Sequence, residues 1–262
     1  MVTEQIRFDD GAAYERYMGK WSQLVGEAFI DWLAPQPGLR WLDIGCGNGA
    51  FTEMLIARCA PSAVEGIDPS AGMLGFARTR LASAHVQFQI GDAMALPYAN
   101  DSVDAAVMPL VIFFVPDPAT GVGEMARVVR GGGLVTAYAW DMEGGGFPYE
   151  LVHATLRELG VAPLATPNPA ASQLDTMRGL WRGAGLVDIA TREITVRRSY
   201  AGLEDYWATI LGGPSVGPRL AAMAPADIAL LNSRIAARLP TAADGRITCS
   251  ARANAIKGRC PA

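Results

Sequence analysis

At residues 41–50 the sequence reads Trp41-Leu42-Asp43-Ile44-Gly45-Cys46-Gly47-Asn48-Gly49-Ala50, and this stretch decides the fold. Leu42 and Ile44 are typical of the end of a buried strand, and glycines follow at every second position. Residues 51–59 (FTEMLIARC) then have the spacing of a helix. A strand, a glycine-rich turn and a helix in this order present bare backbone and a helix N-terminus to a ligand. The stretch predicts a binding loop, although a tight turn without a ligand has the same local pattern.

Strand-like and helical segments alternate on both sides of this loop as far as residue 140. Such alternation predicts an α/β fold with a Rossmann-like, doubly wound, mostly parallel sheet and right-handed crossovers. Strands are expected at 63–68, 86–90, 103–107 and 134–140, and helices at 73–81 and 121–129.

The rhythm changes beyond residue 141. Two more strand-like segments, 187–198 and 247–257, flank a mostly helical stretch at 203–239, which predicts a helical cap inserted before the final strand. Residues 161–172 carry three prolines and are expected to form a long loop or lid. We therefore expect an N-terminal helical lid at 1–36, a ligand-binding core at 37–142, and a cap with the closing strands at 143–262.

The composition argues against several function classes. The chain has 262 residues, half of them hydrophobic, and a formal net charge of −4, so it lacks the basic surplus of a general nucleic-acid binder. Arg192, Arg197 and Arg198 form the nearest thing to a basic cluster, and we interpret them as a solvated face or sheet edge.

The cysteines and the chain ends suggest a cytoplasmic protein. The four cysteines contain no CxxC pair, so neither a metal site nor a disulfide framework is expected. Residues 1–10 lack the pattern of a signal peptide, and the longest apolar run, 105–116, is too short to span a bilayer.

Acidic residues stand at the ends of three successive predicted strands: Asp43, Asp68 and Asp92. The dinucleotide pattern G-x-G-x-x-G/A is formally met by Gly45, Gly47 and Ala50, so a nicotinamide-dependent oxidoreductase is an alternative. A carboxylate two residues before the first glycine would repel a pyrophosphate, whereas it suits a ligand with an ammonium group.

The run LDIGCGNG at 42–49, Asp68, GDA at 91–93 and EMARVVRGGGLV at 124–135 together resemble class I S-adenosylmethionine-dependent methyltransferases. The likeness is to the small-molecule branch that includes ubiquinone and menaquinone biosynthesis enzymes. It implies a seven-stranded sheet whose last strand is antiparallel. Arg130-Gly131-Gly132-Gly133 departs from the family, which usually has a proline before the glycine pair.

The resemblance implies a role for each matching residue in holding S-adenosylmethionine. Gly45 and Gly47 would bring backbone to the methionine part, and Asp43 would bind its ammonium group directly or through water. Asp68 would accept hydrogen bonds from both ribose hydroxyls. At the adenine, Asp92 and the Ala93 N–H would bind its edge, and Met73 and Met94 would pack on its faces. Pro69 would lie next to Asp68, and Pro109 and Leu110 beside the reacting methyl. Tyr14 and Trp21 would form an aromatic lid.

The acceptor side is less determined. Asp68 and Asp92 could instead be helix or turn caps, and Met73 and Met94 could be plain core residues. Tyr14 and Trp21 could simply pack an N-terminal helix on the domain. Methyl transfer from a sulfonium needs mainly alignment and a dry pocket, so we name no general base. We expect His85 in a loop and interpret His153, on a cap helix, as structural. Candidate acceptor contacts are Phe114, Trp140, Asp141 and Tyr149. A non-catalytic or regulatory protein that keeps the cofactor site is a further alternative.

Overall fold

The computed structural model describes residues 9–82, 85–211, 213 and 216–262, in which seven strands form one sheet. The strand order is β3-β2-β1-β4-β5-β7-β6, and β7 is antiparallel to both of its neighbours while the other paired strands are parallel. The predicted α/β fold with an antiparallel last strand is therefore confirmed. The strands are β1 Arg40–Ile44, β2 Ala63–Asp68, β3 Val86–Ile90, β4 Val103–Pro109, β5 Val129–Trp140, β6 Val187–Tyr200 and β7 Ile247–Arg259.

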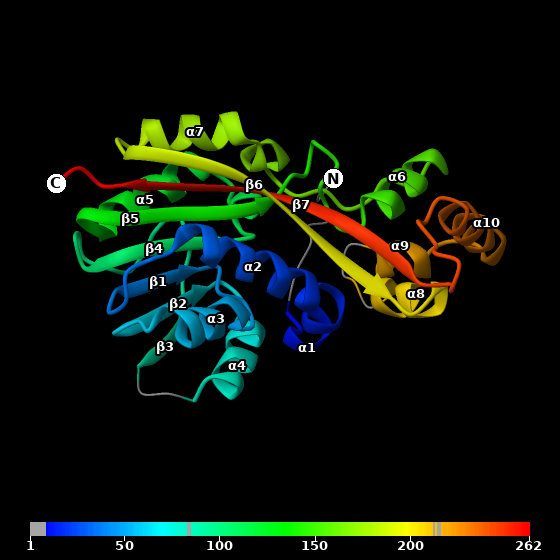
Figure 1. The fold of residues 1–262 in the computed structure, drawn as a ribbon, viewed down its shortest axis with the longest axis horizontal. Helices are drawn as coiled ribbons and strands as arrows, with labels where there is room; N and C mark the ends of the chain where they lie inside the picture. The colour runs from blue at the N-terminus through cyan, green and yellow to red at the C-terminus, as the bar shows by residue number, and fades with distance from the viewer. Residues whose placement is uncertain (1–8, 83–84, 212, 214–215) are drawn as a thin grey trace.

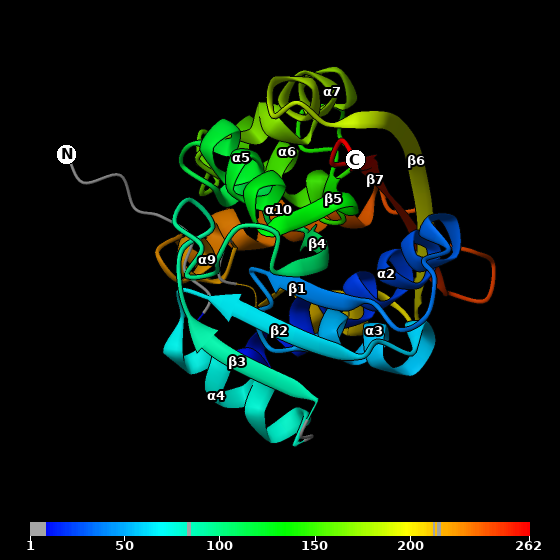
Figure 2. The ribbon, with the colours of Figure 1, turned by 90° about the vertical axis from the view of Figure 1, so that its left-hand side faces the viewer.

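Helices cover both faces of the sheet (Figure 2). Helices α2, α3 and α4 lie on one face, and α5 and α7 lie on the other. Their bounds are α2 Lys20–Leu33, α3 Ala50–Cys59, α4 Ala71–Arg80, α5 Pro118–Val128 and α7 Leu174–Gly183. A short α1 (Gly11–Tyr14) and a π-helical turn, η1 (Glu15–Gly19), precede α2, and all three lie within the expected lid at 1–36. The first eight residues of the expected lid lie outside the described residues.

The cap is carried on a ribbon that extends beyond the sheet (Figure 1). Trp140 at the end of β5 pairs with Ala253 of β7, which pairs with Ile194 of β6. Beyond this point β6 and β7 continue together, and the cap helices lie around their far end. These helices are α6 Glu150–Glu158, α8 Leu203–Leu211, α9 Gly217–Ala221 and α10 Pro225–Ala236, and two 3-10 turns, η2 Ile112–Phe114 and η3 Pro169–Ser172, complete the fold.

Capping residues explain why two helices begin earlier than their apolar spacing predicts. Ser70 accepts a hydrogen bond from the Met73 N–H, so α4 begins at Ala71. Asp117 caps α5, whose first residue is Pro118. Strand β5 also begins earlier than expected, because residues 130–133 join it through an irregular register against β4 rather than forming a loose turn.

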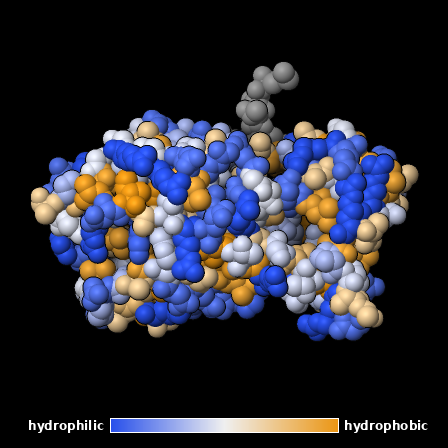
Figure 3. All heavy atoms as spheres, turned by 45° about the horizontal axis from the view of Figure 1, so that its top comes forward, coloured by the Kyte–Doolittle hydropathy of each residue, from blue (hydrophilic) through white to orange (hydrophobic). Residues whose placement is uncertain are grey.

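Large aromatic side chains fill the interior between the layers. Trp21, Trp41, Trp140 and Trp181 are all fully buried, and Trp181 Nε1 donates to the Val135 carbonyl at 3.1 Å. On the surface shown in Figure 3, apolar side chains gather in separate patches among hydrophilic ones. Within the described residues no helix combines the length and the apolar character needed to cross a membrane.

Candidate functional site

The glycine loop between β1 and α3 has a backbone that other residues rarely adopt. Gly45, Gly47 and Gly49 have φ values of 70°, 53° and 79°. A β-carbon at Gly45 would collide with the Val111 side chain, which follows β4. One at Gly47 would lie 3.1 Å from Met73 Cε. The loop is therefore enclosed by residues from two neighbouring strand ends.

Asp68 at the end of β2 holds the same loop in place. Its Oδ2 accepts from the Gly47 N–H at 3.0 Å, and its Oδ1 accepts from the Ser70 N–H at 2.8 Å. Burial raises the pKa of Asp68, and these two backbone hydrogen bonds oppose the rise. Each carboxylate oxygen has lone pairs left for a further donor.

Asp43 at the end of β1 is fully buried beneath the loop. Its Oδ2 accepts a hydrogen bond from Thr52 Oγ1 at 2.6 Å, whereas its Oδ1 is buried and has no hydrogen-bond partner among the residues that the structure describes. Burial raises the pKa of Asp43 to about 7, the Thr52 hydrogen bond opposes this, and the charge of Asp68 adds to it. A buried carboxylate oxygen that lacks a donor is a place for a cationic or N–H group of a ligand.

The third acid completes a row along adjacent strands. Because β1, β2 and β3 are neighbours and parallel, Asp43, Asp68 and Asp92 follow consecutive strand ends at one edge of the sheet. Asp92 is exposed, and its Oδ1 accepts from the Met94 N–H at 2.8 Å. Burial thus decreases from Asp43 outward to Asp92. The other residues predicted to contact the cofactor near these acids differ in exposure: Met73 is buried, Ala93 and Met94 are partly buried, and Pro69 is exposed.

The end of β4 has a strained backbone next to the loop. Pro109 is the last residue of β4, and Leu110 has a φ of 62°, which is unusual for a residue with a branched side chain. The Leu110 N–H donates to the Tyr138 carbonyl at 2.7 Å, which holds this conformation. The chain turns sharply here, which brings Val111 against Gly45.

The two predicted lid aromatics lie in different places. The Tyr14 hydroxyl is 3.1 Å from Ser22 Oγ. Burial raises the pKa of Tyr14, the Ser22 hydrogen bond opposes the rise, and the charges of Glu15 and Asp68 add to it. The influence of Asp68 shows that this phenol lies near that carboxylate. Trp21 has no exposed surface; its Nε1 donates to the Tyr200 hydroxyl at 3.1 Å, and its ring meets the ring of Trp140 edge-on. The structure therefore brings Tyr14 to the acidic row and places Trp21 in the interior.

A polar latch that the sequence did not reveal ties the lid to the loop. Asn48 Nδ2 donates to Glu15 Oε2 at 2.8 Å, and Arg80 Nη2 pairs with the same oxygen at 2.9 Å. Ser70 Oγ also donates to Asp9 Oδ1 at 3.0 Å. Only Asn48, inside the glycine motif, carried a sequence signal, because the partners are distant in the chain.

The candidate acceptor residues are held by other protein groups. Asp141 is 6% exposed and pairs with Arg252, whose Nε lies 3.0 Å from Asp141 Oδ2. Tyr149 is fully buried and donates its hydroxyl to the Tyr17 carbonyl at 2.7 Å. Trp140 is 2% exposed, and Phe114 is partly buried with its ring 4.7 Å from that of Phe113.

His153 on α6 is buried and stacks on Phe147 with 5.0 Å between ring centroids. Burial lowers the pKa of His153 to about 4, and Arg157 contributes, so the imidazole is neutral at pH 7. Within the described part of the chain its buried Nε2 has no hydrogen-bond partner.

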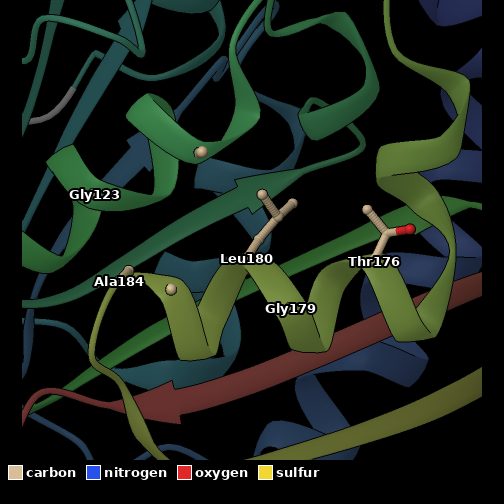
Figure 4. A pocket seen from close by; sticks show the side chains of 7 residues that line it. Gly123, Thr176, Gly179, Leu180 and Ala184 are labelled. Atoms are coloured by element: carbon tan, nitrogen blue, oxygen red, sulfur yellow. The ribbon is translucent and has the colours of Figure 1, made fainter.

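A groove of about 450 Å³ lies between α5 and α7, away from the row of acids (Figure 4). It has no titratable side chain and presents mainly small or apolar residues, so it offers no group for catalysis. Its lining residues are Ala119, Gly123, Thr176, Gly179, Leu180, Gly183 and Ala184.

Comparisons with known proteins place the chain among methyltransferases. The profile of a family described as "Methyltransferase domain" matches residues 42–137. A malonyl-[acyl-carrier protein] O-methyltransferase of Methylococcus capsulatus is 31% identical over 201 residues, which cover 74% of this chain and 67% of that protein. A ubiquinone/menaquinone biosynthesis C-methyltransferase of Roseobacter denitrificans is 34% identical over 115 residues, or 42% of this chain and 46% of that relative's length.

The fold has counterparts among solved structures. A phosphoethanolamine N-methyltransferase 2 of Haemonchus contortus, solved in complex with S-adenosyl-L-methionine, superimposes with a TM-score of 0.61 at 20% identity, covering 96% of this chain and 57% of that one. At this level of identity the likeness concerns the fold.

Proposed function

Since the chain belongs to the methyltransferase family, we propose that it transfers a methyl group from S-adenosylmethionine to a small-molecule acceptor. The observation that carries the proposal is the Oδ1 of Asp43, which is buried next to the glycine-rich loop and has no hydrogen-bond donor among the described residues. A cofactor with an ammonium group supplies that donor.

The residues present fit this cofactor. Asp43 has a free acceptor atom for the ammonium group, and Asp68 has lone pairs left for ribose hydroxyls. Met73 packs against the loop at Gly47, where it can cover the adenine. Supporting roles are proposed for Gly45, Pro69, Asp92, Ala93, Met94, Pro109, Leu110 and Tyr14 as cofactor contacts.

The role of Trp21 as a cofactor contact requires a movement. Its indole N–H is bound to the Tyr200 hydroxyl and its ring meets the Trp140 ring edge-on, so we propose that it reaches the cofactor only when the lid shifts.

The protein's contribution to the reaction is alignment and exclusion of water. The cofactor's sulfonium supplies an activated methyl group with a neutral thioether leaving group, so no acid is needed. The lid, latched by Glu15 to Asn48 and Arg80, covers the glycine loop and keeps water out. Leu110 and Val111 fix the backbone beside the loop, which restricts the direction from which an acceptor approaches. We propose no general base.

The acceptor is proposed to bind between the end of the core and the cap. Phe114, Trp140 and Asp141 of the core and Tyr149 of the cap lie at or beyond the carboxyl ends of the strands, where ligands of doubly wound sheets bind. Accordingly we divide the chain into a lid at 1–36, a cofactor-binding core at 37–142 and an acceptor-binding cap with closing strands at 143–262. We further propose that the protein acts in the cytoplasm and does not act on nucleic acid.

Calorimetric titration with S-adenosylmethionine, S-adenosylhomocysteine and NAD tests the cofactor assignment. Binding of the first two without binding of NAD is expected, and the reverse would make the protein an oxidoreductase. Incubation with methyl-labelled S-adenosylmethionine and a panel of small acceptors then separates an enzyme from a regulatory binding protein. Label transfer to any acceptor identifies an enzyme.

A further inference from the structure

Arg198 is an arginine at a core position of β6. The inward face of this strand is formed by alternate residues, and Ile194, Val196 and Tyr200 on that face are 5%, 8% and 1% exposed. Arg198 lies between the last two, partly buried, while Arg197 points outward and is exposed. The sequence predicts Arg192, Arg197 and Arg198 on a solvated face or at a sheet edge. Strand β6 is an edge strand of the sheet, and Arg192 and Arg197 are exposed, whereas Arg198 is partly buried on the inward face.

The charge of Arg198 has no counter-charge in the described part of the protein. Its Nη1 is buried with no hydrogen-bond partner in the described ranges, and its Nη2 makes a long contact, 3.4 Å, to Thr209 Oγ1. The guanidinium carbon lies 4.7 Å from the centre of the Tyr200 ring. Among the residues that the structure describes, no carboxylate forms an ion pair with it.

The groups around the guanidinium are neutral at physiological pH. Burial raises the pKa of Cys249, the residue opposite Arg198 on β7, to about 11, although Arg198 opposes the rise. Burial likewise raises the pKa of Tyr200. A partly buried cation with a buried, unpaired N–H group is costly among neutral groups, and an anionic ligand would offset that cost.

The position of Arg198 relates it to the acceptor side of the site. It lies four residues beyond Ile194, which is level with the end of β5, and hence roughly 13 Å past the carboxyl end of that strand at about 3.3 Å per residue. Tyr200 connects it to the site, because its hydroxyl accepts from Trp21 Nε1 and the Trp21 ring contacts Trp140.

We propose that Arg198 binds a carboxylate or phosphate group of the methyl acceptor. This inference rests on the proposed function and narrows its substrate class to elongated molecules. One end takes the methyl group near the glycine loop, and the anionic group at the other end pairs with Arg198 in the cap. The fork of guanidinium N–H groups suits the two oxygens of either anion.

Thermal unfolding of the full chain tests this, with and without S-adenosylhomocysteine and at constant ionic strength. The probes are benzoate, its uncharged counterpart benzamide, and inorganic phosphate. We expect the midpoint of wild-type unfolding to rise saturably with benzoate or with phosphate, but not with benzamide. The anion that acts distinguishes a carboxylate acceptor from a phosphorylated one.

Substitutions assign the effect to the side chain. Arg198→Met keeps the aliphatic bulk and removes the charge, so the anion effect disappears while the midpoint without ligand stays equal or rises. Arg197→Met, the exposed neighbour on the same strand, is the matched control and keeps the full anion effect. Should Arg198→Met fail to fold, Arg198→Lys is expected to bind the active anion about tenfold more weakly, because the two-pronged contact is lost.

Two results would overturn the proposal: no saturable rise with either anion in the wild type, or a rise that survives Arg198→Met. Neither depends on the cofactor assignment. A missing response to S-adenosylhomocysteine alone would instead contradict the proposed function.

Discussion

The carboxylate of Asp68 accepts a hydrogen bond from the backbone N–H of Gly47, with 3.0 Å between Oδ2 and the nitrogen. This bond joins the end of β2 to the loop after β1. The acid proposed to bind the ribose therefore also fixes the loop proposed to bind the methionine part, so changes at either residue are expected to affect both.

Asp68→Asn should weaken the binding of S-adenosylmethionine by about 10- to 100-fold. The amide retains the shape but turns a donor toward one of the two backbone N–H groups and loses the charge, and hydrogen bonds to charged groups contribute about 1.5–3 kcal/mol each. Calorimetric titration measures the loss. Asp117→Asn, a helix cap on α5, is the control and should leave binding unchanged; equal affinity of Asp68→Asn and wild type would contradict the ribose assignment.

Gly45→Ala should lower the free energy of unfolding by about 2–4 kcal/mol, because alanine is strained at this positive φ and its β-carbon would collide with Val111. Gly38→Ala isolates the first effect, because Gly38 has a φ of 81° and open space around it, so a loss of about 1 kcal/mol is expected there. Urea denaturation measures both. Adding Val111→Ala to Gly45→Ala should recover part of the loss, and no recovery would argue against a collision.

The buried Asp43 should make the protein without cofactor less stable as the pH rises. Its pKa is about 7 in the folded protein and 3.8 as the reference value, so the native state holds an extra proton between these values. Raising the pH from 5 to 8 should therefore cost about 2–3 kcal/mol from this residue. Urea denaturation at both pH values checks the sign, and Asp43→Asn should remove this component; a wild-type slope that persists in the variant belongs to other groups.

The same residue predicts proton release on cofactor binding. An ammonium group at Asp43 Oδ1 favours the ionised carboxylate, so binding at pH 6 should release a proton and affinity should increase with pH through 7. Calorimetry in two buffers with different ionisation enthalpies counts the protons. Proton uptake in place of release would exclude an ammonium contact at this carboxylate.

Glu15→Ala should raise the dissociation constant of S-adenosylmethionine about three- to fivefold with a change in unfolding free energy below about 1 kcal/mol. Glu15 is partly exposed, so its ion pair with Arg80 adds little to global stability, but its loss releases the lid from Asn48. Glu53→Ala provides the control, because Glu53 also pairs with Arg80 but lies on α3, outside the lid. The two alanine variants should differ in cofactor dissociation rate; identical rates would show that the latch does not hold the lid.

Much of the candidate site could be predicted from short stretches of sequence. Gly45 and Gly47 are marked by their spacing between a strand and a helix, and the observed positive φ values are those that glycine tolerates best. Asp43 and Asp68 are recognisable because each closes an apolar strand, and parallel neighbours place such ends side by side. The alternation of segments likewise led to the α/β sheet and to the cap before the final strand.

By itself, then, the sequence determined the sheet, the loop and the row of acids, because these depend on neighbours within a few residues. Only the tertiary structure decided that Trp21 bonds to Tyr200, 179 positions away, that Val111 encloses Gly45, and that Arg198 faces inward. Side chains alternate between the two faces of a strand, so shifting the register of β6 by one residue would exchange Arg198 for Arg197. That register is set by the full length of pairing with β7 and by packing against the cap, which no short stretch of sequence contains.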